Sequence, residues 1–231
     1  IKAKTISEAW FLILYNILDK AYVQPIQRGS FEKQQIRYQL PGLSVFIEEP
    51  WKDMVPEISP LSGIPAPTSM EYIENYFVEY LMNPDPKPNE TYRYSSRIHY
   101  PLKNGETQLE RVIKILKETP FTNQAVIEVG TPEDLDICIG REGKCDPPCL
   151  RIIDFKAIPG KEKPLLTVSV YFRSWDLWAG FPTNLGGIEL LKQYVAEETG
   201  LANGPMYAYS AGAHIYHYQL EFVKAKTGKN V

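Results

Sequence analysis

The sequence predicts an α+β fold in which helices pack on a half of the chain that is built mainly of strands. Apolar residues recur at helical spacing in the first half, whereas from Leu150 they alternate with polar residues at the period of a strand. The 231 residues are 44% hydrophobic and 23% charged, and they contain no repeat and no obvious linker. We therefore expect residues 1–231 to form a single domain in which helices cover a mixed β-sheet.

The N-terminal part is expected to begin with a helix and to continue into strands. Thr5 and Glu8 have the spacing of a capping box, so the helix should begin at Thr5. Residues 22–48 predict loops and strands, and the proline-rich residues 50–68 predict an irregular segment. The apolar positions of the helix recur at helical spacing: Ile6, Trp10, Ile13, Leu14 and Ile17.

Two further helices and a short strand are expected in the middle of the chain. A second capping box, formed by Thr68 and Glu71, should open a helix that ends before Pro84. Residues 125–129 are typical of a short apolar strand. The third helix is indicated by Leu109, Val112, Ile113 and Leu116.

The C-terminal part predicts strands around one long helix. Alternation along residues 166–172 places Arg173 on the more polar face of its strand. Residues 180–182, Gly-Phe-Pro, are expected to break the chain before a helix that ends at Gly200. Residues 205–213 predict another strand, and the tail predicts a final helix.

The composition argues against several classes of partner. The formal net charge is −3 and the isoelectric point is about 5.7, so neither a nucleic acid nor an anionic membrane is an expected partner. No apolar run approaches the roughly 18 residues that a membrane span needs, and the N-terminus lacks the pattern of a signal peptide. Three cysteines are too few for a disulfide framework, which favours a cytoplasmic location.

Cys149 is the strongest candidate for a reactive side chain. Two prolines stiffen the backbone before it, and Arg173 follows it by 24 residues. A thiol is a strong nucleophile only as the thiolate, which a nearby arginine favours. Two other interpretations stay open on these residues alone: a buried core cysteine, or a zinc site that Cys149 forms with Cys138 and Cys145 at a spacing unusual for zinc.

Several short motifs in register resemble those of the thymidylate synthases, most closely the short archaeal members of that family. The strongest part of the resemblance covers about residues 130–217, and weaker matches at Arg28-Gly29 and Tyr94 extend it toward the N-terminus. The resemblance implies the fold of that family and a methyltransferase activity. The motifs that carry it are Glu133-Asp134-Leu135-Asp136, Pro147-Pro148-Cys149, Tyr171-Phe172-Arg173-Ser174-Trp175-Asp176, Gly180-Phe181-Pro182-Thr183-Asn184 and His214-Ile215-Tyr216.

The resemblance implies a covalent mechanism. Cys149 would attack C6 of the uracil ring of deoxyuridylate (dUMP), which makes C5 nucleophilic. C5 would then take a one-carbon unit from a reduced methylene-pterin, and hydride transfer would complete the methyl group of dTMP. The donor is either methylene-tetrahydrofolate or methylene-tetrahydromethanopterin, and no metal is expected.

The resemblance also assigns contacts with the nucleotide. Arg173 would favour the thiolate and, with Arg28 and the Ser174 hydroxyl, hold the 5′-phosphate. Asn184 would read the pyrimidine edge, since its amide can match O4 and N3–H of uracil, whereas an aspartate here would suit cytosine. Taken alone, Asn184 is equally suited to cap the helix that ends near Gly200.

The sugar and the pterin are placed by the same resemblance at the C-terminal motifs. His214 and Tyr216 would bind the 3′-hydroxyl of the deoxyribose, and their i, i+2 spacing on a strand puts both side chains on one face. Asp176, with Gly180 beside it, would bind the N–H groups of the pterin.

Two residues are assigned to the activation of the ring. Tyr94 would assist proton removal at C5. Glu74 is the candidate for the glutamate that polarises the pyrimidine, with Glu71 and Glu79 as alternatives. All three glutamates also fit a solvated helix face.

The chain departs from the family pattern at positions that affect the phosphate and pterin sites. Leu150 stands where a histidine usually follows the nucleophile, and Phe172 where a glutamine usually precedes Arg173. Asn123-Gln124 replace two arginines that reach across the dimer, so the protein is expected to be a monomer or a homodimer. The chain ends 15 residues after Tyr216, so the segment that closes over the pterin is expected to be missing.

Two alternatives to the methyltransferase stay open. In a pyrimidine-nucleotide hydroxymethylase, water would capture the methylene intermediate. In a nucleotide-binding protein, binding would have been kept and turnover lost. The sequence defines neither the one-carbon donor nor the tryptophan near it, for which Trp51, Trp175 and Trp178 are candidates by type.

Overall fold

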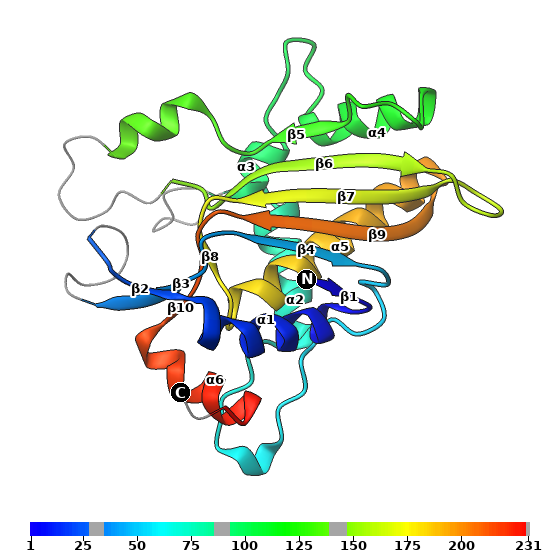
Figure 1. Cartoon of the computed structure of the whole chain (residues 1–231). Coiled ribbons are helices and arrows are strands. Elements are labelled where there is room, and N and C mark those ends of the chain that lie inside the picture. Colours follow the sequence, from blue (N-terminus) through cyan, green and yellow to red (C-terminus); the bar gives the residue numbers. More distant parts are fainter. Residues whose placement is uncertain (28–34, 86–92, 139–146, 230–231) are drawn as a thin grey trace.

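β-Sheet forms the framework of the chain (Figure 1). The computed structural model describes residues 1–27, 35–85, 93–138 and 147–229. Within these ranges a six-stranded sheet runs in the order β1 (Lys2–Ala3), β4 (Leu43–Ile47), β9 (Ala202–Ser210), β7 (Leu165–Phe172), β6 (Leu150–Ile158) and β5 (Val126–Glu128), and a four-stranded sheet runs in the order β2 (Tyr22–Pro25), β3 (Ile36–Gln39), β10 (Ala213–Tyr216) and β8 (Trp175–Asp176). Both sheets combine parallel and antiparallel pairs, which confirms the predicted mixed β-structure.

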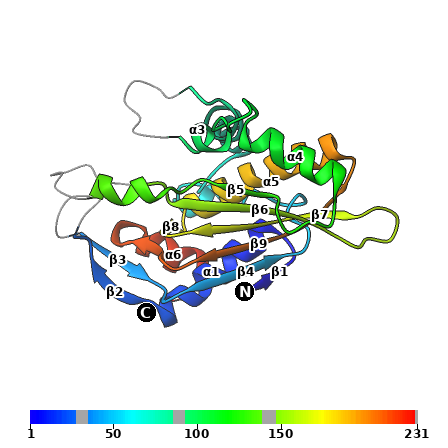
Figure 2. The same cartoon turned by 90° about the horizontal axis from the view of Figure 1, so that it is seen from above.

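The helices pack against this framework, with α5 at the centre of the contacts. Figure 2 shows α5 along one face of the six-stranded sheet with α4 on the same side, and α5 also contacts α1, α2 and β9. None of the helices in the described ranges is long and apolar enough to cross a membrane. The helices are α1 (Ile6–Lys20), α2 (Met70–Asn75) with its π-helical continuation η2 (Tyr76–Met82), α3 (Tyr94–Ile98), α4 (Gln108–Glu118), α5 (Gly180–Thr199) and α6 (Leu220–Thr227), and short 3₁₀ turns are η1 (Pro60–Ser62), η3 (Pro132–Cys138) and η4 (His217–Gln219).

Helix α1 begins where the sequence predicts. The hydroxyl of Thr5 accepts a hydrogen bond from the backbone N–H of Glu8 at 3.1 Å. The Glu8 carboxylate accepts from the N–H of Lys4 at 2.6 Å and not from that of Thr5, so only half of the capping box forms. The predicted apolar face is buried as a whole.

Helix α2 begins one residue later than predicted. Its N-cap is Ser69, whose hydroxyl accepts from the N–H of Tyr72 at 3.1 Å. Thr68 does not cap the helix, because it is buried and its hydroxyl accepts a hydrogen bond from the Thr183 hydroxyl of α5 at 2.9 Å. The helical segment ends before Pro84, as expected.

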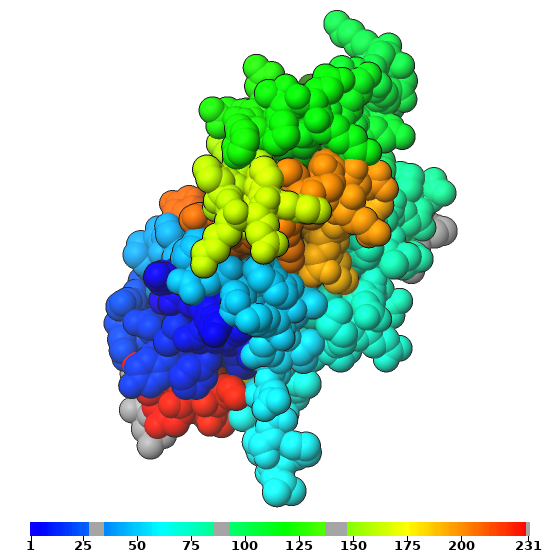
Figure 3. Space-filling model, turned by 90° about the vertical axis from the view of Figure 1, so that its right-hand side faces the viewer, coloured from blue at the N-terminus to red at the C-terminus, as the bar shows by residue number. Residues whose placement is uncertain are grey.

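Residues 50–68 are irregular, as predicted, apart from the 3₁₀ turn at Pro60–Ser62. This segment projects from the body of the molecule in Figure 3, where it is drawn in cyan. Leu61 at its tip is 97% exposed. The tip therefore lies outside the apolar core, whereas Met54, Ile58 and Ile64 pack against it.

Helix α4 confirms the third predicted helix, but the start of α5 corrects a prediction. Residues 180–182 do not break the chain: α5 begins at Gly180 and contains Pro182 in its first turn. Proline costs little there because the first N–H groups of a helix have no partner within the helix. Asn184 lies in the second turn, so it is not the N-cap; Gly200 ends the helix with a left-handed φ of 73°, as expected.

The strand predicted over residues 205–213 is two strands in different sheets. β9 belongs to the six-stranded sheet and β10 to the four-stranded sheet, with a turn at Gly212 between them. A Cβ at Gly212 would lie 2.6 Å from the backbone oxygen of Arg173, so only glycine fits this close approach. The tail follows β10 and forms the final helix, α6, as predicted.

One face of the six-stranded sheet remains exposed opposite α5. Tyr207 and Tyr209 of β9 and Ile152 of β6 point outward, and Tyr209 is 45% exposed. Neighbouring aromatic rings pair on this outer face: Tyr171 and Tyr209 stack at 5.6 Å between centroids, and Phe46 lies 4.8 Å from Tyr207. We call Phe46, Ile152, Tyr171, Tyr207 and Tyr209 the outer aromatic face.

The contact between α5 and η2 depends on glycine. A Cβ at Gly187 would lie 2.4 Å from Cδ1 of Tyr76, a distance that real Cβ atoms do not show. We expect Gly187→Ala to lower the free energy of unfolding by roughly 1–3 kcal/mol, as overpacking does, despite a gain of about 1 kcal/mol in helix propensity. Glu197→Ala, at an exposed position of the same helix, is the control and should change it little. Urea denaturation measures both; a Gly187→Ala protein as stable as the original would contradict the prediction.

Candidate active site

The two strongest sequence motifs meet at the ends of β6 and β7. The backbone N–H of Arg173 donates to the carbonyl of Cys149 at 2.9 Å. Its side chain turns back onto the same segment: Nε donates to the carbonyl of Pro148 at 3.3 Å, and Nη2 donates to that of Pro147. The guanidinium is therefore fixed against the backbone that carries the cysteine. This contact confirms that the two motifs are neighbours in space.

Cys149 is partly exposed and lies beside two tyrosines. The Tyr94 hydroxyl accepts a hydrogen bond from the backbone N–H of Leu150, the next residue, at 3.2 Å. The second tyrosine is Tyr216, whose pKa is raised. Burial is the main cause that raises the pKa of Tyr216, and the charges of Asp176 and Cys149 add to it. Partial exposure does not fit the alternative of an inert core cysteine.

His214 and Tyr216 lie on one face of β10, as their spacing predicts. Their rings meet edge to face at 4.8 Å between centroids. Nδ1 of His214 is 2.8 Å from the carbonyl of Gly212, so Nδ1 carries the hydrogen and Nε2 is an acceptor. Nε2 is buried, and no group in the described part of the chain pairs with it. Burial is the main cause that lowers the pKa of His214, and the cation of Arg37 also lowers it.

The Asp176 carboxylate is engaged by four N–H groups. One oxygen accepts from the backbone N–H of Trp178 and from Nε2 of Gln219, both at 3.1 Å. The other oxygen accepts from the backbone N–H groups of Ala179 and Gly180, at 3.3 and 3.2 Å, and so caps the start of α5. A carboxylate has about four acceptor sites, so a ligand would have to share one of these.

Asn184 is held by a tryptophan. The indole N–H of Trp175 donates to Oδ1 of Asn184 at 3.1 Å. The Trp175 ring stacks on Phe172, with centroids 4.3 Å apart and planes at 9°, and lies 4.7 Å from the ring of Phe181. Phe172 is therefore part of the support for Asn184, although it departs from the sequence pattern.

Comparisons with known proteins agree with the motifs. The sequence profile of the thymidylate synthase family matches residues 76–230. A protein of Methanosarcina mazei that is provisionally named a thymidylate synthase is 33% identical over 227 residues, which cover 97% of this chain and 92% of that protein.

The chain belongs to the thymidylate synthase family.

Other members extend the comparison. A Mycoplasma pneumoniae thymidylate synthase is 32% identical over 121 residues, 52% of this chain and 39% of that protein. The structure of thermostable thymidylate synthase A from Bacillus subtilis aligns with a TM-score of 0.69 over 98% of this chain and 85% of that one, at 14% identity. This likeness confirms the predicted α+β thymidylate synthase fold. Membership of this family implies a methyltransferase that uses dUMP and a donor of the methylene-tetrahydrofolate type.

Several predicted residues are not brought to Cys149 by contacts that the structure describes. Arg28 lies outside the described residues, as does Cys145. Ser174 is half-buried between β7 and β8. Among the described residues, no group of histidine, cysteine, aspartate and glutamate could hold a metal ion.

The three candidate glutamates differ in their surroundings. Glu71 and Glu74 are exposed on α2. Glu79 is half-buried on η2, where its backbone carbonyl accepts from the buried Arg93 at 2.8 Å. Its neighbour Tyr80 packs edge to face on Tyr94 at 5.1 Å. Of the three glutamates, Glu79 is therefore the one in η2, the helical segment that packs on Tyr94. The assignment of Glu74 stays a prediction.

Sequence reasoning missed two residues that support the site. Gln219 is buried and links two elements, because its Oε1 accepts from the N–H of Tyr216 at 2.8 Å while its Nε2 donates to Asp176. Arg37 lies directly opposite Tyr216 in the pairing of β3 with β10. The two partners that make these residues important are distant in the chain, since Asp176 precedes Gln219 by 43 residues and Tyr216 lies in a different strand from Arg37.

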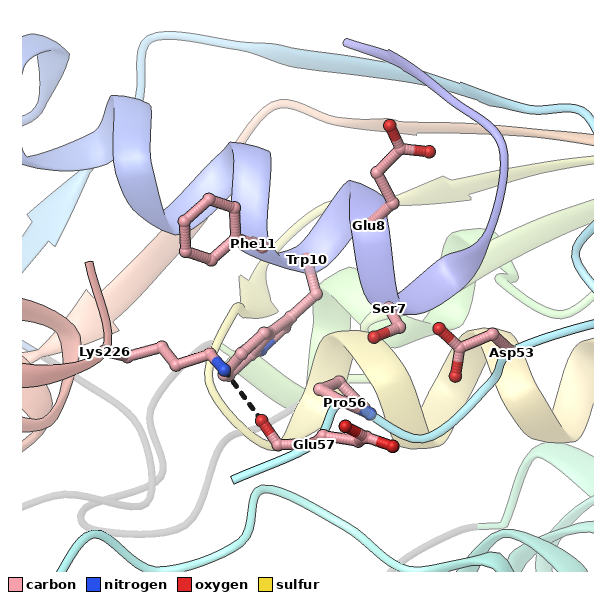
Figure 4. Close-up of a pocket in the computed structure, with 8 residues that line it drawn as sticks. All are labelled: Ser7, Glu8, Trp10, Phe11, Asp53, Pro56, Glu57 and Lys226. Atoms are coloured by element: carbon pink, nitrogen blue, oxygen red, sulfur yellow. Dashed lines mark hydrogen bonds between the residues drawn. The ribbon is translucent and has the colours of Figure 1, made fainter. Parts of the chain in front are cut away.

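A cavity of about 420 Å³ adjoins the site and is lined by Gln35, Ile36, His217 and Tyr218. Tyr218, which lines this cavity, stacks on Tyr216 at the end of β10, at 5.7 Å with planes at 6°. A separate cavity of about 250 Å³ lies between α1, residues 53–57 and α6 (Figure 4). There Nζ of Lys226 donates to the carbonyl of Glu57 at 2.7 Å. This second cavity contains none of the residues predicted for catalysis.

The buried His214 should make the protein sensitive to acid. Its pKa is lowered in the folded state, so the unfolded chain binds this proton more readily than the folded chain. The free energy of unfolding should therefore fall as the pH drops below about 6.5, by at most about 1.4 kcal/mol per pH unit for one proton. We expect this slope to be shallower in His214→Asn, measured by urea denaturation between pH 5 and 8.

The control for this prediction is His99→Asn. Burial also lowers the pKa of His99, so its substitution should remove a separate share of the slope, and the two effects should add. A His214→Asn protein with the original slope would show that His214 is not buried in its neutral form.

Proposed function

We propose that the chain methylates dUMP to dTMP at C5 through a covalent adduct with Cys149, using a reduced methylene-pterin as donor. The observation that carries the proposal is the contact of Arg173 with residues 147–149, through both its backbone and its guanidinium. A fixed cation beside a partly exposed thiol favours the thiolate, which is the form that attacks.

In the proposed reaction, Cys149 and Tyr94 each carry out a separate step. The Cys149 sulfur adds to C6, and the π electron pair of the C5–C6 double bond becomes available at C5. The donor supplies the one-carbon unit and the hydride. Tyr94, whose hydroxyl lies at the N–H of Leu150, assists loss of the proton from C5. The Cys149 thiolate leaves from C6 when the C5–C6 double bond is restored.

The same site has groups suited to the nucleotide. Arg173 and Ser174 hold the phosphate together with Arg28. Nε2 of His214, with which no described residue pairs, is an acceptor for a hydroxyl group, and the 3′-hydroxyl of deoxyribose is such a donor. A buried acceptor without a partner is costly, which supports a ligand contact at this atom.

The pterin has an aromatic site available beside the nucleotide. The cavity of about 420 Å³ next to Tyr216 is lined by His217 and Tyr218, and Tyr38 stacks on His217 at 6.1 Å. Such a surface suits a flat ring, from either tetrahydrofolate or tetrahydromethanopterin. Asp176 and Gly180 lie at the start of α5 near this end of β10, where the carboxylate positions the backbone and shares its acceptors with the ring.

We also propose that two copies of the chain pair through the outer aromatic face. An exposed cluster of aromatic and aliphatic side chains on a sheet is unusual for a free surface. Asn123 and Gln124 are exposed and neutral, so this homodimer rests on packing and not on arginines shared between sites.

Tritium release from [5-³H]dUMP tests the reaction, with methylene-tetrahydrofolate and methylene-tetrahydromethanopterin supplied in parallel. Cys149→Ala should reduce release by about 1,000-fold or more, because the nucleophile is removed. Cys138→Ala, which removes a cysteine outside the motif, is the matched control. Binding of dUMP without release from either donor would favour a nucleotide-binding protein. Release with a hydroxymethyl product would favour the hydroxymethylase.

Sedimentation tests the homodimer. Ile152→Lys combined with Tyr209→Lys places two charges on the outer aromatic face and should shift the protein to monomer, by at least about tenfold in the dissociation constant. Leu61→Lys, on the projecting segment, is a control with an exposed apolar residue elsewhere. A monomer at every concentration of the unaltered protein would rule the homodimer out.

A further inference from the structure

The indole N–H of Trp175 determines which end of the Asn184 amide faces the site. An indole N–H is a donor only, so its partner 3.1 Å away has to be the amide oxygen and not the amide nitrogen. In the described part of the chain, no hydrogen bond uses Nδ2 of Asn184, and this side chain is half-buried. The amide therefore offers its two N–H donors to a ligand and has one oxygen lone pair left beside them.

Trp175 itself has little freedom to move. Its side chain is only 2% exposed and lies between the rings of Phe172 and Phe181. Its backbone N–H donates to the carbonyl of Gly212 at 3.1 Å, and it pairs with Ala213 across β8 and β10. The direction of the indole N–H is thus set by packing on both faces of the ring and by the sheet.

We propose that Trp175 is a specificity-determining residue that selects uracil over cytosine by fixing the orientation of Asn184. The inference rests on the proposed function, in which Asn184 reads the pyrimidine edge. Uracil presents a carbonyl acceptor at C4 and an N3–H donor, which match the free N–H groups and the remaining lone pair of the oriented amide.

Cytosine presents the opposite pattern, with an amino donor at C4 and an acceptor at N3. To bind it, the amide would have to turn by half a rotation. That rotation would bring Nδ2 against the indole N–H, where two donors meet, and would leave a buried donor unpaired. Rejecting the wrong ligand through an unpaired buried group is an effective form of discrimination.

Trp175→Phe (W175F) is the direct test, because it keeps an aromatic ring between Phe172 and Phe181 and removes the N–H. The ratio of the dissociation constants of dCMP and dUMP should fall by about tenfold in W175F, chiefly because dCMP binds better. Calorimetry measures both constants without the pterin.

Asn184→Asp (N184D) provides a second background for the same change. A carboxylate has two equivalent oxygens and no orientation to fix, so W175F should not alter the ratio when it is combined with N184D. Trp10→Phe is the matched control outside the site, since it also removes a buried indole N–H, which donates to the carbonyl of Trp178 at 2.9 Å. Trp10→Phe should leave the ratio as it is.

The outcomes separate this inference from the function on which it rests. If the unaltered protein binds dUMP and W175F keeps the original ratio, Trp175 does not set specificity, while the proposed function stands. If the unaltered protein binds neither nucleotide, the proposed function fails and the specificity role fails with it.

A measurement on the indole protons keeps the inference testable if W175F does not fold. In the unaltered protein, the indole N–H of Trp175 should exchange slowly with solvent, and Asn184→Ala should accelerate that exchange at least about tenfold by removing its acceptor. The indole proton of Trp10, which bonds to a backbone carbonyl, should be unaffected and is the internal reference. If Asn184→Ala accelerates the exchange of no indole proton, the inference is overturned.

Discussion

The geometry of the site depends on the carboxylate of Asp176. It accepts hydrogen bonds from the start of α5 and from Gln219, and Gln219 in turn binds the backbone of Tyr216. One side chain thereby joins β8, the long helix and the end of β10. Each of these elements carries a residue that faces the substrate in the proposed reaction. Loss of this carboxylate would leave the N–H groups at the start of α5 without a partner and release Gln219.

A second constraint brings the two sheets together. β9 runs in the large sheet and β10 in the small one, and the turn between them passes so close to Arg173 that Gly212 has no room for a side chain. Arg173 is held from the other side by the carbonyls before Cys149. Cys149, Arg173 and His214 are therefore fixed relative to one another by contacts with the backbone, which is the rigidity that the proposed covalent mechanism requires.

The sequence was informative where a pattern is local or where a motif is contiguous. Helical spacing placed α1 and α4, and the cysteine and arginine motifs were correctly expected to be neighbours. The sequence was misleading where a contact with a residue distant in the chain determines where a helix begins. The Thr68 hydroxyl pairs with α5, so Ser69 caps α2, and the Asp176 carboxylate caps α5, so Gly180 can begin a helix. Such long-range contacts leave no local signal.

Phe172 and Trp175 are another case in which packing in the fold, and not the local sequence, shows the role of a residue. In the sequence alone, Phe172 before Arg173 suggests that a polar contact has been lost. In the fold, the rings of Phe172 and Trp175 stack with their centroids 4.3 Å apart, and the indole N–H of Trp175 donates to Asn184. A hydrogen bond to an amide is directional, so a donor carried on a packed ring holds Asn184 more firmly than a flexible polar side chain would. The departure at Phe172 is then the packing that allows Trp175 to orient the amide.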